Sequence, residues 1–78
     1  MEFKEVCLRI KEIIKNQIKV DLNNDDLLLD NGVDSVSMIN IVVDIENFFD
    51  IDFEPQDLNY KTLRTITDIA NYINMLQR

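Results

Sequence analysis

Hydrophobic residues near the N-terminus recur at the spacing of an α-helix. They stand at offsets of 0, 3, 4, 7, 10 and 11 residues, namely at Phe3, Val6, Cys7, Ile10, Ile13 and Ile14. Residues at these offsets share one face of a helix. The pattern predicts an amphipathic first helix. Cys7 falls inside its apolar stripe, so we interpret it as a small buried hydrophobic residue rather than a redox group.

The residues from 18 to 34 show no lasting periodicity. Apolar and polar residues alternate as far as Leu22, and a run of Asn and Asp at 23–26 then breaks the pattern. We expect a long ordered loop, attached to the core by Leu27, Leu28 and Leu29. Asn31-Gly32 predicts a turn at its end, because Gly adopts backbone conformations that other residues resist. A loop of this length in a small domain tends to be functional.

A second helix is predicted to start at Asp34 or Ser35, either of which can cap it, and to run to about Phe49. Placed about 100° apart per residue, its apolar side chains fall on two faces. The wider face suits the core and carries Met38, Ile41, Val42, Ile45, Phe48 and Phe49. The narrower face has acidic residues beside it and carries Val36, Ile39 and Val43. A helix in a small bundle needs only one buried face, so the narrower face is a candidate for contact with a partner.

A short helix is predicted after the second one. Ile51 and Phe53 are expected to point inward from the linker that precedes it. Pro55 suits the first position of a helix over about 55–61, with Leu58 as its anchor in the core.

The last predicted helix begins at Thr65, where Thr65-x-x-Asp68 resembles a capping box. Its apolar positions recur at helical spacing, with Tyr72 at the edge of a stripe that consists of Ile66, Ile69, Ala70, Ile73 and Leu76. The predicted fold class is therefore all-α. We expect a small four-helix bundle of three longer helices and one short helix, in a single domain over residues 1–78.

Composition narrows the function classes. The chain has 78 residues, 46% of them hydrophobic and 29% charged, which is typical of a folded soluble domain. No apolar run exceeds three residues and the N-terminus is charged, so we expect no membrane span and no secretory signal. The single Cys7 excludes an internal disulfide and fits a reducing cytoplasm. We expect no enzyme, because so short a chain leaves no room for a deep pocket and lacks His, the usual base beside a Ser or Cys nucleophile.

Charge is unevenly distributed along the chain. The net charge is −7, yet residues 20–60 hold eleven acidic side chains and no basic one, while both ends are mildly basic. A field of this sign repels nucleic-acid phosphates and anionic lipids, so we expect neither as a partner. It favours proteins with a basic docking surface.

The sequence lacks the residues that most types of functional site require. Asp21-x-Asn23-x-Asp25 starts like a calcium-binding loop, but Asp26 stands where such a loop needs Gly, and Gly32 where it needs Glu. We therefore expect no metal site. The segment that remains is Gly32-Val33-Asp34-Ser35-Val36. A serine in the first turn of a helix favours a phosphate on its oxygen, because free N–H groups and the helix dipole offset the charge. A plain capping serine is the simpler interpretation of the same position.

The stretch GVDSVSMINIVVDIENFFDIDF, from Gly32 to Phe53, resembles the acyl and peptidyl carrier proteins. The resemblance covers nearly the whole chain, and it implies a four-helix bundle that is not an enzyme. It also implies that Ser35, in the Asp34-Ser35 motif, receives 4′-phosphopantetheine from coenzyme A through a phosphopantetheinyl transferase with Mg²⁺. The thiol of that arm would carry an acyl or aminoacyl group as a thioester. A helical protein-interaction module without a prosthetic group remains the alternative.

The resemblance further implies a docking surface for enzymes that load and process the cargo. Val36, Ile39 and Val43 match its apolar positions, and Asp34, Asp44, Glu46 and Asp50 would form an acidic rim. We expect a monomer in the cytoplasm. Two residues depart from the family pattern: Val36 replaces the more usual Leu, and Asn31 replaces an apolar residue. These departures argue slightly against the carrier of housekeeping fatty acid synthesis, and polyketide synthesis, nonribosomal peptide synthesis and D-alanine transfer all stay open.

Overall fold

The described part of the chain forms three α-helices, with two single 3-10 turns between them. The computed structural model describes residues 1–77, and α1 spans Phe3–Ile18, α2 Ser35–Phe49 and α3 Ile66–Leu76. The 3-10 turns are Leu29–Asn31 and Pro55–Asp57. The all-helical prediction is confirmed, whereas four helices are not found in the described part of the chain.

The expected short helix at 55–61 is wrong beyond its first turn. Pro55 does occupy the first position of a 3-10 turn, but the turn ends at Asp57. The side chain of Asn59 accepts hydrogen bonds from the N–H groups of Lys61 and Thr62, at 2.9 and 3.0 Å. Such side-chain contacts compete with helical hydrogen bonds. Leu58, the expected anchor, stays 40% exposed.

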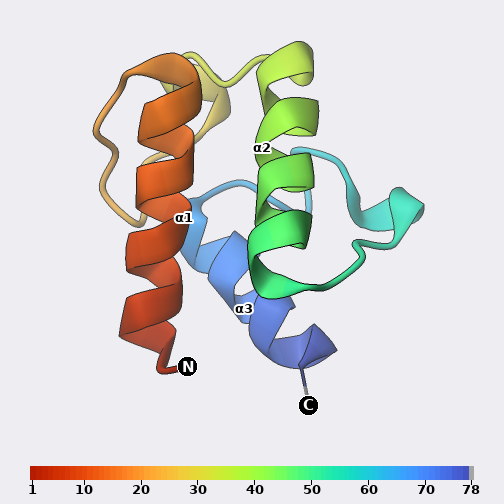
Figure 1. Cartoon of the computed structure of the whole chain (residues 1–78). Helices are drawn as coiled ribbons and strands as arrows, with labels where there is room; N and C mark the ends of the chain where they lie inside the picture. The colour runs from red at the N-terminus through yellow and green to blue at the C-terminus, as the bar shows by residue number, and fades with distance from the viewer. Residues whose placement is uncertain (78) are drawn as a thin grey trace.

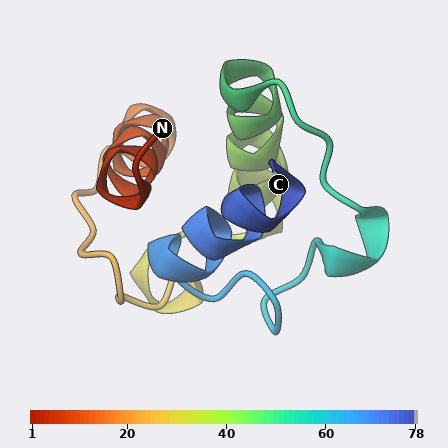
Figure 2. The same ribbon diagram turned by 90° about the horizontal axis from the view of Figure 1, so that it is seen from below.

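The helices are arranged around one core. α1 and α2 lie side by side and run in opposite directions, as Figure 1 shows, and α3 crosses beneath them, as is clearest from below in Figure 2. Fully buried side chains from all three helices, among them Ile10, Ile45 and Ile69, belong to one cluster. Cys7 is buried in that cluster, as predicted. No helix within residues 1–77 has the length and the apolar content that a bilayer crossing requires.

The loop between α1 and α2 is tied to the start of α3. The N–H of Leu28 donates to the carbonyl oxygen of Arg64 at 2.9 Å, and the N–H of Thr67 donates to that of Asn24 at 3.0 Å. Leu28 is fully buried, but Leu27 and Leu29 are exposed. The predicted attachment of this loop by three leucines is therefore right for Leu28 alone.

Thr65 caps α3 as expected, because its hydroxyl accepts from the N–H of Asp68 at 3.1 Å. In a capping box the Asp68 carboxylate would accept a hydrogen bond from the N–H of Thr65. Here it accepts instead from the N–H of the preceding residue, Arg64, also at 3.1 Å. Tyr72, expected at the edge of the apolar stripe, is buried and stacks on Phe53 with ring centroids 5.0 Å apart.

The two-faced interpretation of α2 holds with one exception. Met38, Ile41 and Ile45 are buried, and the three residues of the narrower face are exposed. Phe48 was expected in the core but is 52% exposed, and it touches Phe49 edge to face. Phe48 lies at the margin of the wider face, and the neighbouring helices cover less of α2 than the full width of that face.

Candidate functional site

The turn that leads into α2 is held by backbone contacts. Gly32 has a φ of 94°, in the left-handed region, as the sequence predicted. Val33 follows with its side chain fully buried and its N–H bonded to the carbonyl oxygen of Leu28 at 3.1 Å. The turn is thus attached to the core immediately before the helix begins.

Asp34 is the residue that caps α2. Its carboxylate accepts a hydrogen bond from the N–H of Ser37 at 2.8 Å. Hydrogen bonds from Ser37 lower the pKa of Asp34, because they favour the charged form of the carboxylate. Since Asp34 fills the capping role, Ser35 is left as the first residue of the helix, with its side chain exposed. The interpretation of Ser35 as a plain capping serine is therefore wrong.

Ser35 has surroundings that suit a phosphate group. The first N–H groups of an α-helix lack partners within the helix and carry the positive end of its dipole. A phosphodiester on the Ser35 oxygen would lie at that end and in contact with solvent. The exposed position of Ser35 at the start of α2 is compatible with the predicted attachment of 4′-phosphopantetheine.

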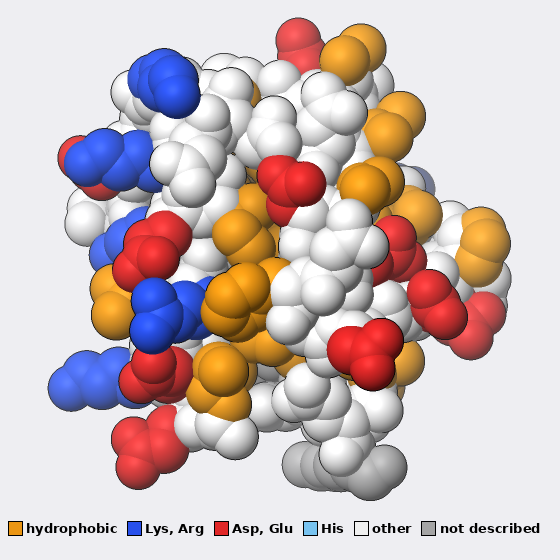
Figure 3. All heavy atoms as spheres, viewed as in Figure 1, with side chains coloured by type: hydrophobic (Ala, Val, Ile, Leu, Met, Phe, Trp, Pro, Cys, Tyr) orange, Lys and Arg blue, Asp and Glu red, His pale blue; other side chains and the backbone are white. Residues whose placement is uncertain are grey.

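An exposed apolar strip continues from Ser35 along α2. It consists of Val36, Ile39 and Val43, which are 68%, 63% and 46% exposed. Exposure of that extent leaves these side chains free to contact another protein. In Figure 3, hydrophobic side chains run along the outer edge of α2, on the side away from α1.

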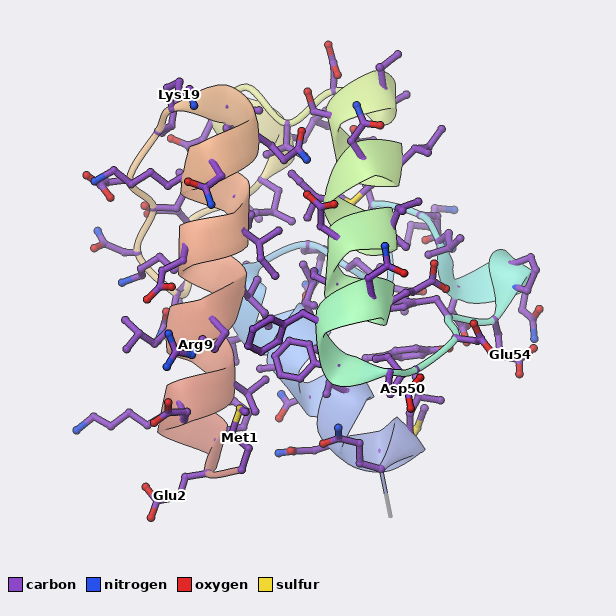
Figure 4. All side chains as sticks on the ribbon, in the orientation of Figure 1. Met1, Glu2, Arg9, Lys19, Asp50 and Glu54 are labelled. Carbon is purple, nitrogen blue, oxygen red and sulfur yellow. The ribbon has the colours of Figure 1, made fainter. Side chains whose placement is uncertain are left out.

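The predicted acidic rim is divided by the structure. The Glu46 carboxylate accepts from the N–H of Phe53 at 2.9 Å and faces the connector between α2 and α3, residues 51–65. Asp44 points the other way and accepts a hydrogen bond from Gln17 of α1. Asp50 follows the last residue of α2 and is exposed, and Figure 4 shows it at the end of α2, away from Arg9 on α1. Asp34, Glu46 and Asp50 can therefore flank the strip, whereas Asp44 lies toward α1.

Basic side chains are concentrated on the α1 side of the molecule, where acidic side chains lie among them. Figure 3 shows most of the visible Lys and Arg side chains over α1, while the charged side chains visible over α2 are acidic. Two bases of α1 are already paired, since Arg9 contacts both Glu5 and Glu12, and Lys15 contacts Asp21. The strip on α2 therefore faces solvent within an acidic field.

A groove of about 390 Å³ lies between α2 and the connector. The α2 side contributes mainly apolar residues, from Ser35 to Glu46, and the connector contributes Leu58, Asn59 and Tyr60. The expectation that the chain has no room for such a pocket is wrong. Because Leu58 does not enter the core, the connector spans the edge of α2 without closing on it. The sequence offered no periodic signal for the three connector residues, so reasoning from it missed them.

Comparison with known proteins gives consistent similarities. A family model described as "Phosphopantetheine attachment site" matches residues 8–73. The chain is 33% identical over 69 residues to an acyl carrier protein of Phytoplasma mali, covering 83% of this chain and 80% of that protein. It is 38% identical over 75 residues to an acyl carrier protein homolog of Mycoplasma genitalium, covering 90% and 86%. It is 30% identical over 74 residues to an acyl carrier protein of Thermotoga maritima, covering 90% and 89%.

Proposed function

This chain belongs to the acyl carrier protein family, whose members bear a phosphopantetheine arm, and we propose that Ser35 is the residue that carries the arm here. A protein of this family carries acyl groups between enzymes and does not itself catalyse the reactions of those acyl groups. The arm, when bound, supplies a thiol on which the acyl group is held as a thioester.

The transfer of phosphopantetheine to Ser35 is a single displacement reaction at phosphorus. The Ser35 oxygen forms a bond to the phosphorus atom next to the pantetheine of coenzyme A. The pyrophosphate bond of coenzyme A breaks, adenosine 3′,5′-bisphosphate leaves, and the hydroxyl proton passes to a base of the transferase or to water. This chain supplies the oxygen and its orientation, while the transferase and Mg²⁺ supply the charge stabilisation.

The main observation in support of the proposal is that Asp34, and not Ser35, caps α2. Asp34 satisfies an N–H group of the first turn, so the Ser35 hydroxyl is not needed as a cap and stays exposed. The chain contains one other serine, Ser37, which is half-buried and interacts with Asp34. Of the two serines, Ser35 is the more exposed to a second protein.

The experiment is an intact-mass measurement after incubation with coenzyme A, Mg²⁺ and a promiscuous phosphopantetheinyl transferase. The wild-type protein and the Ser37→Ala control are expected to gain the mass of one phosphopantetheine, and Ser35→Ala to gain none. No gain in the wild type, or an equal gain in Ser35→Ala, would contradict the proposal. Circular dichroism of each variant verifies that the helices are intact.

Family membership implies contact with a transferase and with biosynthetic enzymes, and the proposal assigns that contact to the strip of Val36, Ile39 and Val43. Asp34, Glu46 and Asp50 surround it with negative charge, and Asp44 adds to the field from the α1 side. Partners with basic surfaces would associate quickly and release readily, and salt would weaken the contact. These properties suit a carrier that must leave each enzyme after use.

An interaction module without a prosthetic group is not retained as a second function. It would require Ser35 to be dispensable. The phosphopantetheine-attachment family model covers the turn, all of α2 and most of α3, and this favours a carrier.

A further inference from the structure

The phenol of Tyr60 is bonded to the turn that precedes Ser35. Its hydroxyl donates a hydrogen bond to the carbonyl oxygen of Val33 at 2.8 Å, across 27 residues of sequence. Tyr60 belongs to the connector, where it is half-buried and also lines the groove beside Ser35. A side chain of the connector thus contacts the backbone two residues before the proposed modification site.

That contact fixes one specific peptide plane. The N–H of Val33 donates a hydrogen bond to the carbonyl oxygen of Leu28. The hydrogen bond from Tyr60 therefore satisfies the other backbone polar group of Val33, its carbonyl oxygen. The carbonyl of Val33 and the N–H of Asp34 belong to the same rigid peptide unit. The orientation of this unit determines how Asp34 enters the helix cap, and therefore where the Ser35 oxygen points.

Gly32 itself adds no side-chain restraint to the turn. Gly32 has no side chain, and nothing lies within 4 Å of the place where a Cβ would stand. A glycine in open space permits rotation of the adjoining peptide units. Tyr60 therefore adds, from the connector, a restraint on the Val33 carbonyl that the hydrogen bond between Val33 and Leu28 does not supply.

We propose that Tyr60 is a positioning residue for the modification of Ser35: its hydroxyl holds the Val33–Asp34 peptide so that the Ser35 oxygen meets the transferase in one orientation. This inference rests on the proposed function of Ser35. It assigns Tyr60 no contact with the reacting atoms, because its effect passes through the backbone of Val33 and Asp34.

Tyr72 provides a matched reference for the test. Its hydroxyl accepts from the N–H of Glu54 at 3.2 Å and donates to the Asp57 carboxylate at 2.7 Å. Tyr72 therefore also ties the connector to the rest of the protein through a phenol, but its partners are connector residues and not the turn before Ser35. Loss of either hydroxyl loosens the connector, and only loss of the Tyr60 hydroxyl releases the turn.

The experiment compares the loading kinetics of Tyr60→Phe, Tyr72→Phe and wild type with coenzyme A, Mg²⁺ and purified transferase. One neutral hydrogen bond corresponds to roughly a three- to tenfold change in rate. We expect kcat for Tyr60→Phe to fall by that factor with KM nearly unchanged, because the strip that docks the enzyme is intact. Tyr72→Phe is expected to load at the wild-type rate. Hydrogen exchange at the amides of Asp34 and Ser35 should accelerate in Tyr60→Phe alone.

A protein made by chemical synthesis with 3-fluorotyrosine at position 60 keeps the donor and should load at the wild-type rate. This variant keeps the test decisive even where Tyr60→Phe lowers the folded fraction. Equal losses in the Tyr60 and Tyr72 variants, or a wild-type rate for Tyr60→Phe, would overturn the inference while leaving Ser35 as the modified residue. A wild-type protein that gains no phosphopantetheine would instead overturn the proposed function.

Discussion

The hydroxyl of Tyr72 donates a hydrogen bond to the carboxylate of Asp57 at 2.7 Å, and this contact joins α3 to the 3-10 turn in the connector. The ring of Tyr72 stacks on Phe53, and its oxygen also accepts the N–H of Glu54. The connector is thereby held at three successive points. These contacts lie in the first half of the connector, before Leu58, Asn59 and Tyr60, which line the groove.

Tyr72 makes stability sensitive to alkaline pH. Burial raises the pKa of Tyr72, and the hydrogen bond to Asp57 raises it further, because both oppose the phenolate. The contribution of Tyr72 is therefore complete below the unfolded pKa of about 10 and is lost as pH rises through the folded pKa. We expect Tyr72→Phe to cost about 1 kcal/mol at neutral pH. Thermal denaturation from pH 7 to pH 11 should show the difference between wild type and variant shrinking above about pH 10. A constant difference would contradict this.

Asp34 makes stability sensitive to acid. Hydrogen bonding from Ser37 lowers the pKa of Asp34, so its contribution is present above the unfolded pKa of about 4 and is lost as pH falls through the folded pKa. We expect Asp34→Ala to lower Tm by a few degrees at pH 7, and this difference should shrink as pH falls through the folded pKa, because a protonated carboxyl is a weaker cap than a carboxylate. Asp34→Asn, which keeps a capping oxygen, is the control and should stay close to wild type at pH 7. An Asp34→Ala deficit that persists unchanged in acid would exclude the charged cap.

Helical periodicity in the sequence was sufficient to predict the exposed apolar strip on α2. The positions of Val36, Ile39 and Val43 relative to the wider apolar face follow from the turn of the helix alone, and all three are exposed. Phe48 shows the limit of this argument. An angular stripe gives the direction of a side chain, whereas burial depends on how much of that direction the neighbouring helices cover.

Helical periodicity could not predict the groove or the hydrogen bond between Tyr60 and Val33. Both depend on the course of the connector, which is set by local side-chain contacts such as those of Asn59, and by partners distant in sequence. Leu58 was expected to enter the core on the strength of a helix that ends after one turn. The motif around Ser35 was readable because a cap, a glycine turn and a helix start are all local features.

Gly32 tests the backbone of the turn. Its φ of 94° is unfavourable for residues with a Cβ, but no atom lies within 4 Å of the Cβ position. Gly32→Ala should therefore be destabilising through backbone strain alone, by about 1–2 kcal/mol. Gly32→Asn should lose less, because Asn tolerates left-handed conformations better. Urea denaturation of both variants measures the difference. Equal losses for Ala and Asn would show that strain is not the cause.

Cys7 should be a slow nucleophile in the folded protein. Burial raises the pKa of Cys7, and this effect outweighs the lowering by the nearby charge of Lys11. Since the thiolate is the reactive form, native protein at pH 8 should react with iodoacetamide at least ~10-fold more slowly than protein in urea. Intact-mass spectrometry at timed intervals measures both rates. Similar rates in the two conditions would mean that Cys7 is accessible in the fold.

Ile39 and Phe48 allow a controlled test of the docking strip, because both are large apolar residues of α2 that are more than half exposed, at 63% and 52%. Ile39 lies in the strip, one turn after Ser35, whereas Phe48 lies one turn after Asp44, whose carboxylate accepts a hydrogen bond from Gln17 of α1. Neither side chain is essential to the core, so Ile39→Ser and Phe48→Ser should both leave Tm within a few degrees of wild type.

Their effects on partner enzymes should differ. Loss of one apolar contact from a protein interface weakens it by roughly tenfold when the side chain is buried on binding. We therefore expect Ile39→Ser to raise the KM of the phosphopantetheinyl transferase by about that factor, and Phe48→Ser to leave KM unchanged. Added salt should raise KM for all three proteins, because it screens the acidic field that each of them retains. A larger effect from Phe48→Ser than from Ile39→Ser would move the docking surface to the α1 side of α2, where Asp44 already points.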